Sequence, residues 1–394
     1  MPKKHYEYSL LTTEEDLEKF YEENKNTEWI GFDTEFIGEK RYHTLLCVIQ
    51  LATPIGNYVV DALTIKDFSS ITKLLEDPKI LKLTHAGDND YRLFYKRFNI
   101  IPKNTFDTQI AAGFVGFKYP TSFQKLVDKE LKVHVPKGYT VSNWEARPIN
   151  KKQIEYALND VIYLKELYDK LTKKLEALHR VQWVKEECEK MEHIDFYKTK
   201  PHKEALKNSM ITSLNPQEQA FLLRLYRWRV DEASRKDYSK EMILPSKMIS
   251  TIVRNINSGK NALKHDRRLS NSIVKRHWDT FSELFNKKIT DEEREVIQNI
   301  KPESDIDPQV NTMLEMLYSI IEYICQNRSV APSLVLHRTQ FKMMKADPSF
   351  TEPSILVGWR AQLLGEDLLR WMVERKGLTI EMKDGRCIIS MKES

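Results

Sequence analysis

The stretch "EWIGFDTEF", residues 28–36, decides the fold because it joins a buried strand to two acidic side chains. Its apolar residues suit a strand inside a sheet, and Asp33 and Glu35 follow at once. Residues two apart on a strand point to the same face, so both carboxylates project together while Thr34 points away. Two like charges at the end of an apolar run repel each other and resist desolvation. The pattern therefore indicates a positively charged partner for this pair.

Strand and helix patterns alternate through the first ~200 residues. Apolar runs predict strands, and capped amphipathic patterns predict helices. The predicted strands are 28–35, 44–53, 57–63 and 80–87, and the predicted helices are 12–23, 65–79 and 88–98. Strands with helices packed over them predict an α/β domain with a mixed sheet.

The chain becomes almost wholly helical from about Asn150. Apolar residues at three- and four-residue spacing predict helices through 151–195, 215–290 and 305–376. The stretch 198–219 holds two prolines and little apolar content, which is typical of a linker. The last residues, 377–394, form two alternating runs around Asp384-Gly385, which predicts a hairpin.

Composition indicates a soluble globular protein of two or three domains. The chain has 394 residues, of which 41% are hydrophobic and 30% charged. No apolar run approaches the ~20 residues of a membrane span, and the N-terminus lacks a secretory signal. The four cysteines lack C-x-x-C spacing, which disfavours a zinc site and disulfides and suits a reducing compartment such as the cytoplasm. A formal net charge of +5 permits an anionic partner without requiring one. For the oligomeric state, we expect a monomer.

Further acidic residues extend the opening pair. "THAGDND" brings Asp88 and Asp90 to a helix start, and "EYALND" sets Tyr156 and Asp160 four residues apart on a helix. Taken alone, the first two are typical helix-start carboxylates and the second spacing arises often by chance. Together, four carboxylates supply the hard oxygen ligands that Mg²⁺ or Mn²⁺ prefers. Two such ions ~4 Å apart can stabilise both the attacking and the leaving oxygen in phosphodiester hydrolysis.

The chain resembles the DEDDy 3′→5′ exonucleases at three motifs. "FDTEF", "HAGDND" and "YALND", in this order, are similar to motifs I, II and III. The resemblance implies five catalytic residues: Asp33, Glu35, Asp90, Tyr156 and Asp160. It also implies that the four carboxylates among them, but not the tyrosine, bind metal. Asp88 is the rival to Asp90, and the H-A-G-x-x-D register favours Asp90.

The sequence segments that flank these motifs narrow the resemblance to the ribonuclease D family. "FDTQIAAGFVG" and "SNWEARPINKKQIEYALNDVIYL" are similar to that family, although Gly138 stands where a polar residue is typical. Two later stretches, beginning "QEQAFLLRLYRWRV" and "SLVLHRTQFKMMK", resemble the helical HRDC module. The predicted domains are an exonuclease domain at 1–205, HRDC-like helical domains at 211–290 and 300–376, and a hairpin tail at 377–394 outside the resemblance.

The resemblance implies a ribonuclease H-like sheet and hydrolysis of RNA from its 3′ end, releasing nucleoside 5′-monophosphates, with tRNA precursors and other small structured RNAs as substrates. It also implies roles: Asp33 bridges two divalent ions, Glu35 and Asp160 complete one site, and Asp90 holds the other through water. Tyr156 would orient or help to deprotonate the attacking water. Two alternatives stay open, a DEDDy exonuclease acting on DNA and an RNA-binding scaffold with a decayed site.

Other side chains near the motifs suggest structural roles. We expect Asp107 to cap the helix "TQIAAGF" and His85 to be hydrogen-bonded and partly buried rather than a base. Trp228 and Trp359 have apolar neighbours at helical spacing, which favours the core over a stacking surface. No G-x-G-x-x-G or G-K-[ST] loop is present, so the use of ATP is not indicated.

Basic and aromatic side chains supply candidates for RNA contacts, with ordinary solvated surface as the alternative. Two groups flank the motifs: Lys40, Arg41 and Tyr42, and Lys137 with Tyr139. A third group, which we call the basic segment, comprises Arg254, Lys260, Lys264, Arg267, Arg268, Lys275 and Arg276.

Overall fold

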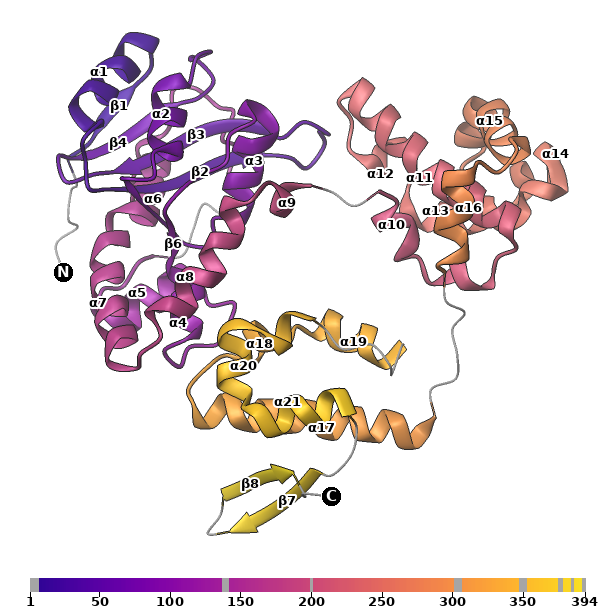
Figure 1. Ribbon diagram of the computed structural model, residues 1–394. Helices are drawn as coiled ribbons and strands as arrows, with labels where there is room; N and C mark the ends of the chain where they lie inside the picture. The colour runs from indigo at the N-terminus through magenta and orange to yellow at the C-terminus, as the bar shows by residue number, and fades with distance from the viewer. Residues whose placement is uncertain are drawn as a thin grey trace. The chain divides into compact units, whose positions relative to one another are not determined.

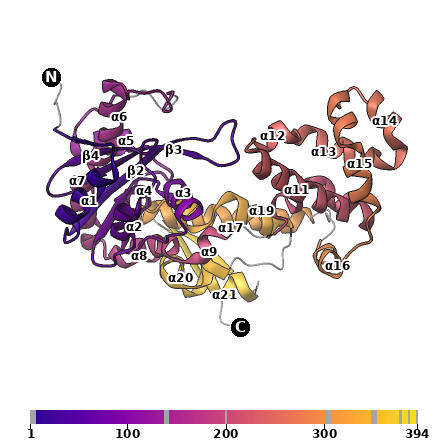
Figure 2. The ribbon, with the colours of Figure 1, turned by 90° about the horizontal axis from the view of Figure 1, so that it is seen from above.

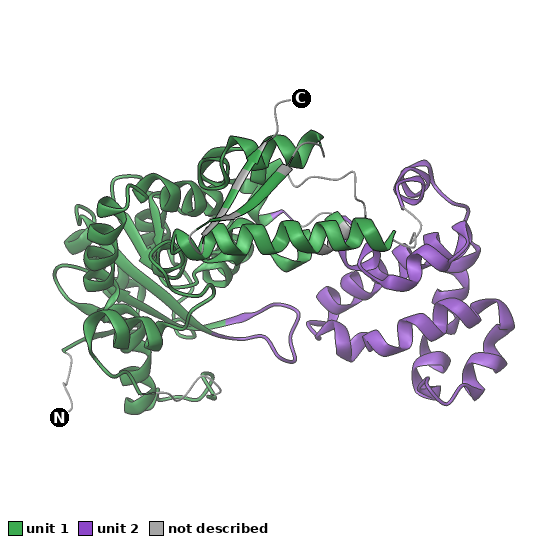
Figure 3. Cartoon of the chain, turned by 90° about the horizontal axis from the view of Figure 1, so that it is seen from below, with its two compact units in different colours: residues 1–35, 46–197, 305–394 green, residues 36–45, 198–304 purple. Residues whose placement is uncertain are grey.

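The computed structural model describes residues 7–136, 142–198, 201–300, 307–346, 353–374, 378–383 and 386–391. Its contacts divide the chain into two compact units (Figure 3). Unit 1 comprises residues 1–35, 46–197 and 305–394, and unit 2 comprises residues 36–45 and 198–304. The division concerns packing, so the family domain boundaries expected from the sequence stay a prediction.

A six-stranded mixed sheet forms the centre of unit 1 (Figure 1, Figure 2). The strand order is β1-β4-β3-β2-β5-β6; β3 and β4 are antiparallel, whereas β1–β4, β2–β5 and β5–β6 are parallel. The strands are β1 Ser9–Leu11, β2 Trp29–Ile37, β3 Leu45–Ala52, β4 Asn57–Asp61, β5 Leu81–Thr84 and β6 Thr105–Asp107. The predicted α/β domain is confirmed. The prediction omitted β1 and β6, whose three residues are too few to show a period.

Helices follow the strands of this sheet, and several begin at a side-chain cap. Thr13 and Asn150 each form a capping box, and Asp107 and Ser122 accept from the first turn of the helix that follows. The helices are α1 Glu14–Asn24, α2 Ser69–Glu76, α3 Asp88–Phe98, α4 Thr108–Gly113, α5 Phe123–Leu131, α6 Lys151–Ile162, α7 Leu164–Ala177, α8 Val181–Glu189 and α9 Ile194–Tyr197.

The last ninety residues also belong to unit 1. Trp359 is 1% exposed, and its ring centroid lies 4.7 Å from that of Phe114 and 5.7 Å from that of Trp183. Arg360 pairs with Glu187 of α8 at 2.6 Å. The elements are α17 Pro308–Asn327, α18 Pro332–Val335, α19 Arg338–Ala346, α20 Gly358–Leu364, α21 Glu366–Glu374, β7 Leu378–Lys383 and β8 Arg386–Met391.

Strands β7 and β8 pair antiparallel, as the tail pattern predicted. Leu378 pairs with Met391 and Lys383 with Arg386, so the ladder closes around the predicted two-residue turn. That turn, Asp384-Gly385, lies outside the described residues.

Unit 2 is helical around its own core. Its helices are α10 Lys203–Leu206, α11 Pro216–Lys236, α12 Lys240–Ile243, α13 Ser246–Asn255, α14 Gly259–His265, α15 Asn271–Asn286 and α16 Asp291–Gln298. The interpretation of 198–219 as a linker was wrong for much of its length. Ala205, Met210 and Ile211 are buried in the core of unit 2, so the few apolar residues of this stretch pack rather than link.

Candidate metal centre

Strand β2 presents three residues to the side on which α6 and α7 pack. A Cβ on Gly31 would lie 3.3 Å from Leu164 Cδ1 and 3.4 Å from the carbonyl oxygen of Val161, so a side chain there would crowd α6 and α7 against the strand. Asp33 and Glu35 follow at two-residue intervals on the same face. Asp160 of α6 reaches the same place: oxygens of Asp33, Glu35 and Asp160 all lie within 4.8 Å of one another.

The segment before α6 is fixed to the sheet by an arginine. The Arg147 guanidinium donates to both carboxylate oxygens of Asp61 at 2.6 Å and to the Cys47 carbonyl at 2.9 Å. Asn150 then caps α6, and Gln153 donates to the Ser142 hydroxyl at 2.7 Å. These bonds fix where α6 begins, and thereby where it carries Asp160.

Helix α3 begins at a turn that Asp107 holds. The Asp107 carboxylate accepts from the backbone N–H groups of Ala86 and Gly87 at 3.0 Å each, and from that of Gln109 at 2.8 Å. Ala86 has a left-handed backbone, with φ of 60°, which this bonding supports. The expected capping role of Asp107 is confirmed, and the same carboxylate also holds the turn into α3.

Asp90 lies in the first turn of α3 and is buried, with 7% of its area exposed. Its Oδ1 accepts a short hydrogen bond from the hydroxyl of Thr34, the residue of β2 that points away from Asp33 and Glu35. Asp90 is therefore close to the carboxylate trio but outside it. Asp88 is exposed and pairs with Arg92 on the helix surface, so Asp90 is the carboxylate directed toward β2.

Burial and like charge raise the pKa values of all four carboxyls. Burial, with the charges of Asp160 and Asp90, raises the pKa of Glu35 to about 8. Burial and the Asp90 charge raise the pKa of Asp160 to about 7. Burial raises the pKa of Asp90 to about 7, although the Thr34 hydrogen bond opposes the change. Burial above all, then the charges of Asp90, Asp160 and Glu35, raises the pKa of Asp33 well above its ordinary value.

This set of donors fits a divalent cation. It consists of carboxylate oxygens, the ligands of Mg²⁺ and Mn²⁺, without the imidazole or thiolate that favour softer metals. Between described residues, no Lys or Arg forms an ion pair with any of the four carboxylates. A bound cation would offset the repulsion that raises their pKa values.

Tyr156 lies one turn before Asp160 on α6. Its ring centroid is 6.3 Å from that of Trp144, which is 3% exposed, so the indole limits the positions of the phenol. The structure thus brings Tyr156 onto the helix that supplies Asp160, as the spacing predicted.

His85 is structural, as expected. Its ring nitrogens lie 2.9 Å from the Thr108 hydroxyl and 3.0 Å from the Thr121 carbonyl, and burial lowers its pKa. Trp359 belongs to the core of unit 1, and Trp228 packs partly buried against His277 in unit 2. Trp359 therefore has the core position that the pattern favoured, whereas Trp228 is partly buried at the edge of the core of unit 2.

The RNA-contact candidates have different surroundings. Tyr42 packs against the core of unit 2, and its backbone N–H and that of His43 donate to Asp237 at 3.2 and 2.8 Å. The Tyr42 ring is therefore partly buried by packing, which disfavours stacking on an RNA base. Lys137, Gly138 and Tyr139 lie outside the described residues.

The basic segment spans α13, α14 and α15 of unit 2. Of its members, Lys260 and Lys264 are half-buried, and Arg254, Arg267, Arg268, Lys275 and Arg276 are exposed. Arg268 pairs with Asp266 at 2.7 Å. Five basic side chains of this segment are therefore exposed to solvent. Their contact with RNA stays a prediction.

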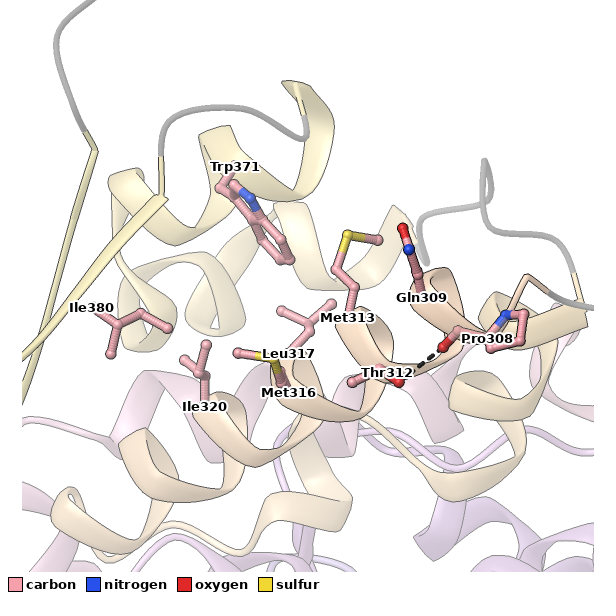
Figure 4. Close-up of a pocket in the computed structure, with 9 residues that line it drawn as sticks. All are labelled: Pro308, Gln309, Thr312, Met313, Met316, Leu317, Ile320, Trp371 and Ile380. Carbon is pink, nitrogen blue, oxygen red and sulfur yellow. Dashed lines mark hydrogen bonds between the residues drawn. The ribbon is translucent and has the colours of Figure 1, made fainter.

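An apolar groove of about 420 Å³ lies between α17, α21 and β7 (Figure 4). It is lined by Met313, Met316, Leu317, Ile320, Trp371 and Ile380, among others. None of the described residues that line it is acidic, and none belongs to the candidate metal centre.

The sequence patterns missed Thr34 and Asp61 as residues that support the site. They placed Arg147 in the family-like segment before motif III but gave it no partner. The strand period predicted the direction of Thr34 but not its partner, because nothing local indicates which helix covers that face. Arg147 and Asp61 are 86 residues apart, and no short-range pattern joins them.

Comparisons with known proteins show what the chain resembles. Residues 8–176 match the family model described as 3′-5′ exonuclease. Ribonuclease D of Gluconacetobacter diazotrophicus is 28% identical over 387 residues, covering 97% of this chain and 94% of that protein. Ribonuclease D of Escherichia coli strain K12 is 27% identical over 366 residues, covering 92% of this chain and 97% of that protein.

A solved structure agrees across nearly the whole chain. The crystal structure of Escherichia coli RNase D, an exoribonuclease involved in structured RNA processing, matches with a TM-score of 0.80 and 25% identity. The match covers 94% of this chain and 99% of that one. Among the described helices, none has the combined length and apolar character that a membrane span requires.

Proposed function

Because the chain belongs to the ribonuclease D family of 3′→5′ exonucleases, we propose that it removes nucleotides from RNA 3′ ends by hydrolysis with two divalent metal ions. The observation that carries the proposal is the trio of Asp33, Glu35 and Asp160, whose oxygens lie within 4.8 Å of one another. The order of the three motifs, the buried Asp90 and Tyr156 on the same helix as Asp160 support it.

Each residue would have a distinct role. Asp33 would hold both ions, Glu35 and Asp160 would complete one site, and Asp90 would serve the other through water. When bound, Mg²⁺ or Mn²⁺ at such a site stabilises the attacking and leaving oxygens and lowers the pKa of the attacking water.

Tyr156 would orient that water and help to remove its proton. The bond broken joins the terminal phosphorus to the 3′ oxygen of the preceding nucleotide, so each turnover releases a nucleoside 5′-monophosphate. The new 3′ hydroxyl then becomes the end of the next substrate.

The proposal extends to substrate and setting. Precursors of tRNA and other small structured RNAs are the proposed substrates, since the relatives are ribonuclease D proteins. The exposed part of the basic segment would bind phosphates of the RNA body while the 3′ end is cut. The buried cysteines Cys47, Cys188 and Cys325 form no disulfide among the described residues, which supports a reducing compartment such as the cytoplasm. The proposed active form is a monomer.

The test is digestion of matched RNA and DNA oligonucleotides with free or blocked 3′ ends, with Mg²⁺ or with chelator. We expect stepwise shortening of the free-ended RNA only, only with Mg²⁺, and 5′-monophosphates as products. Equal shortening of the DNA would favour a DNA exonuclease instead. RNA binding without shortening would favour a scaffold, and internal cleavage of the blocked RNA would contradict exonucleolytic action.

A further inference from the structure

We infer that Thr34 is a positioning residue that fixes the Asp90 carboxylate for metal binding through its buried hydrogen bond. The inference rests on the proposed function and adds a residue that acts through another side chain rather than as a metal ligand. Thr34 and Asp90 come from β2 and α3, 56 positions apart in the chain, and are 6% and 7% exposed. A carboxylate this deeply buried needs a donor, and the Thr34 hydroxyl is one.

The packing of α3 on β2 dictates this pairing. Phe32, two residues before Thr34, shares its face of the strand. The Phe32 ring stacks on Tyr91 with centroids 5.8 Å apart and meets Phe94 edge-on at 5.0 Å. Tyr91 directly follows Asp90, so the same contacts that seat the helix bring Asp90 over Thr34.

The chemistry of threonine suits this task. Its β-branched side chain is restricted in χ1, so a strand that fixes the backbone also fixes the hydroxyl. Asp107 holds the turn before α3, at Ala86 and Gly87. Thr34 then fixes the carboxylate itself, so that Asp90 is constrained at its backbone and at its side chain.

The position of Thr34 between two metal-site residues also has a consequence. Asp33 and Glu35 project from one face of β2, and Thr34 extends from the other face to Asp90. One three-residue stretch of strand therefore sets the places of three carboxylates, two directly and one through a hydrogen bond. A partner that orients a ligating carboxylate without touching the ion commonly affects metal affinity about 10- to 100-fold.

The test compares Thr34→Val, which keeps the shape and removes the hydroxyl, with Thr34→Ser, which keeps the hydroxyl. Mn²⁺ binding to the full-length protein is measured by calorimetry and by electron paramagnetic resonance, and RNA shortening is followed against Mg²⁺ concentration. For Thr34→Val we expect the weaker Mn²⁺ binding step to lose about 10-fold or more in affinity. The KM for RNA should stay within about twofold, while Thr34→Ser should restore most of the Mn²⁺ affinity.

A matched control is Thr105→Val on β6. Thr105 is 8% exposed, and its hydroxyl bonds to the Cys188 carbonyl at 3.2 Å and to Glu192 at 3.0 Å. This variant also loses a buried hydroxyl. Because that hydroxyl bonds to none of the four carboxylates of the site, we expect no change in Mn²⁺ affinity. If Thr34→Val fails to fold, Thr34→Cys, with a weaker donor, should give an intermediate Mn²⁺ affinity.

The outcomes separate this inference from the proposed function. Wild-type Mn²⁺ affinity in Thr34→Val, or equal losses in the valine and serine variants, would overturn the role of Thr34 alone. A wild-type protein that binds no Mn²⁺ and shortens no RNA would overturn the proposed function. In a double variant with Asp90→Asn, Thr34→Val should add no further loss, because the carboxylate that it positions is gone.

Discussion

Replacing Glu35 with glutamine should flatten the pH dependence of stability in the metal-free protein. Burial and neighbouring charge raise the pKa of Glu35 from its ordinary 4.5 to about 8. Between these values the folded chain keeps a proton that the unfolded chain has lost, so the free energy of unfolding falls as pH rises. One pKa unit corresponds to about 1.4 kcal/mol. Because titration is partial near each end of the range, Glu35 should account for a fall of about 3.5 kcal/mol between about pH 5 and pH 8.

The assay is urea unfolding in chelator across this pH range, followed by circular dichroism. Residue 35 cannot ionise in Glu35→Gln, so the variant should lose less stability toward pH 8 than the wild type, by about 3.5 kcal/mol. Glu18→Gln, at an exposed position of α1, serves as the control and should retain the wild-type slope. Saturating Mg²⁺ should flatten the wild-type profile too. Parallel wild-type and Glu35→Gln profiles would refute the reasoning, because the cost of ionisation would then lie elsewhere.

Four further predictions follow from the same geometry. Asp33→Asn should abolish Mg²⁺-dependent shortening of a 3′-extended tRNA while circular dichroism shows an intact fold, and retained activity would remove the two-metal assignment. Tyr156→Phe should lower kcat about 100-fold with little change in RNA affinity, which single-turnover kinetics and filter binding would separate. Asp107→Ala strands the buried N–H of Gly87 and should lower the free energy of unfolding by about 3 kcal/mol; a loss below about 1 kcal/mol would show that the turn holds itself. Lys275→Ala with Arg276→Ala should reduce the magnitude of the slope of log affinity for RNA against log salt by roughly 1.5 if both contact phosphates, and an unchanged slope would exclude them.

Much of unit 1 could be predicted from the sequence, because the patterns that indicate its strands and helices are local. The 28–36 stretch carries both a strand period and the two carboxylates, and β2 has these residues where the pattern indicated. The sequence also predicted helix α3, because Tyr91 and Phe94 lie at helical spacing after the turn at Gly87. Both elements were long enough to show their period.

The remainder depended on contacts distant in sequence. The three-residue strands β1 and β6 exist because β4 and β5 offer them edges, which no local pattern reveals. Tyr42 was a candidate for RNA contact next to the motif, yet it is partly buried against the core of unit 2, and its backbone N–H donates to Asp237. In both cases the deciding partner lies far along the chain.

The two faces of β2 explain why the metal centre needed both kinds of information. Asp33 and Glu35 meet Asp160 on the face that Gly31 opens to α6, and the sequence motifs name all three. Asp90 belongs to the helix on the opposite face and is tied to the strand through Thr34. Three carboxylates therefore depend on the packing of α6, and the fourth depends on the packing of α3. If the proposed two-metal site is right, a change that shifts α3 on β2 should impair the Asp90 part of the site while leaving the trio able to bind one ion. Losses of the two proposed metal positions should then be separable by mutation.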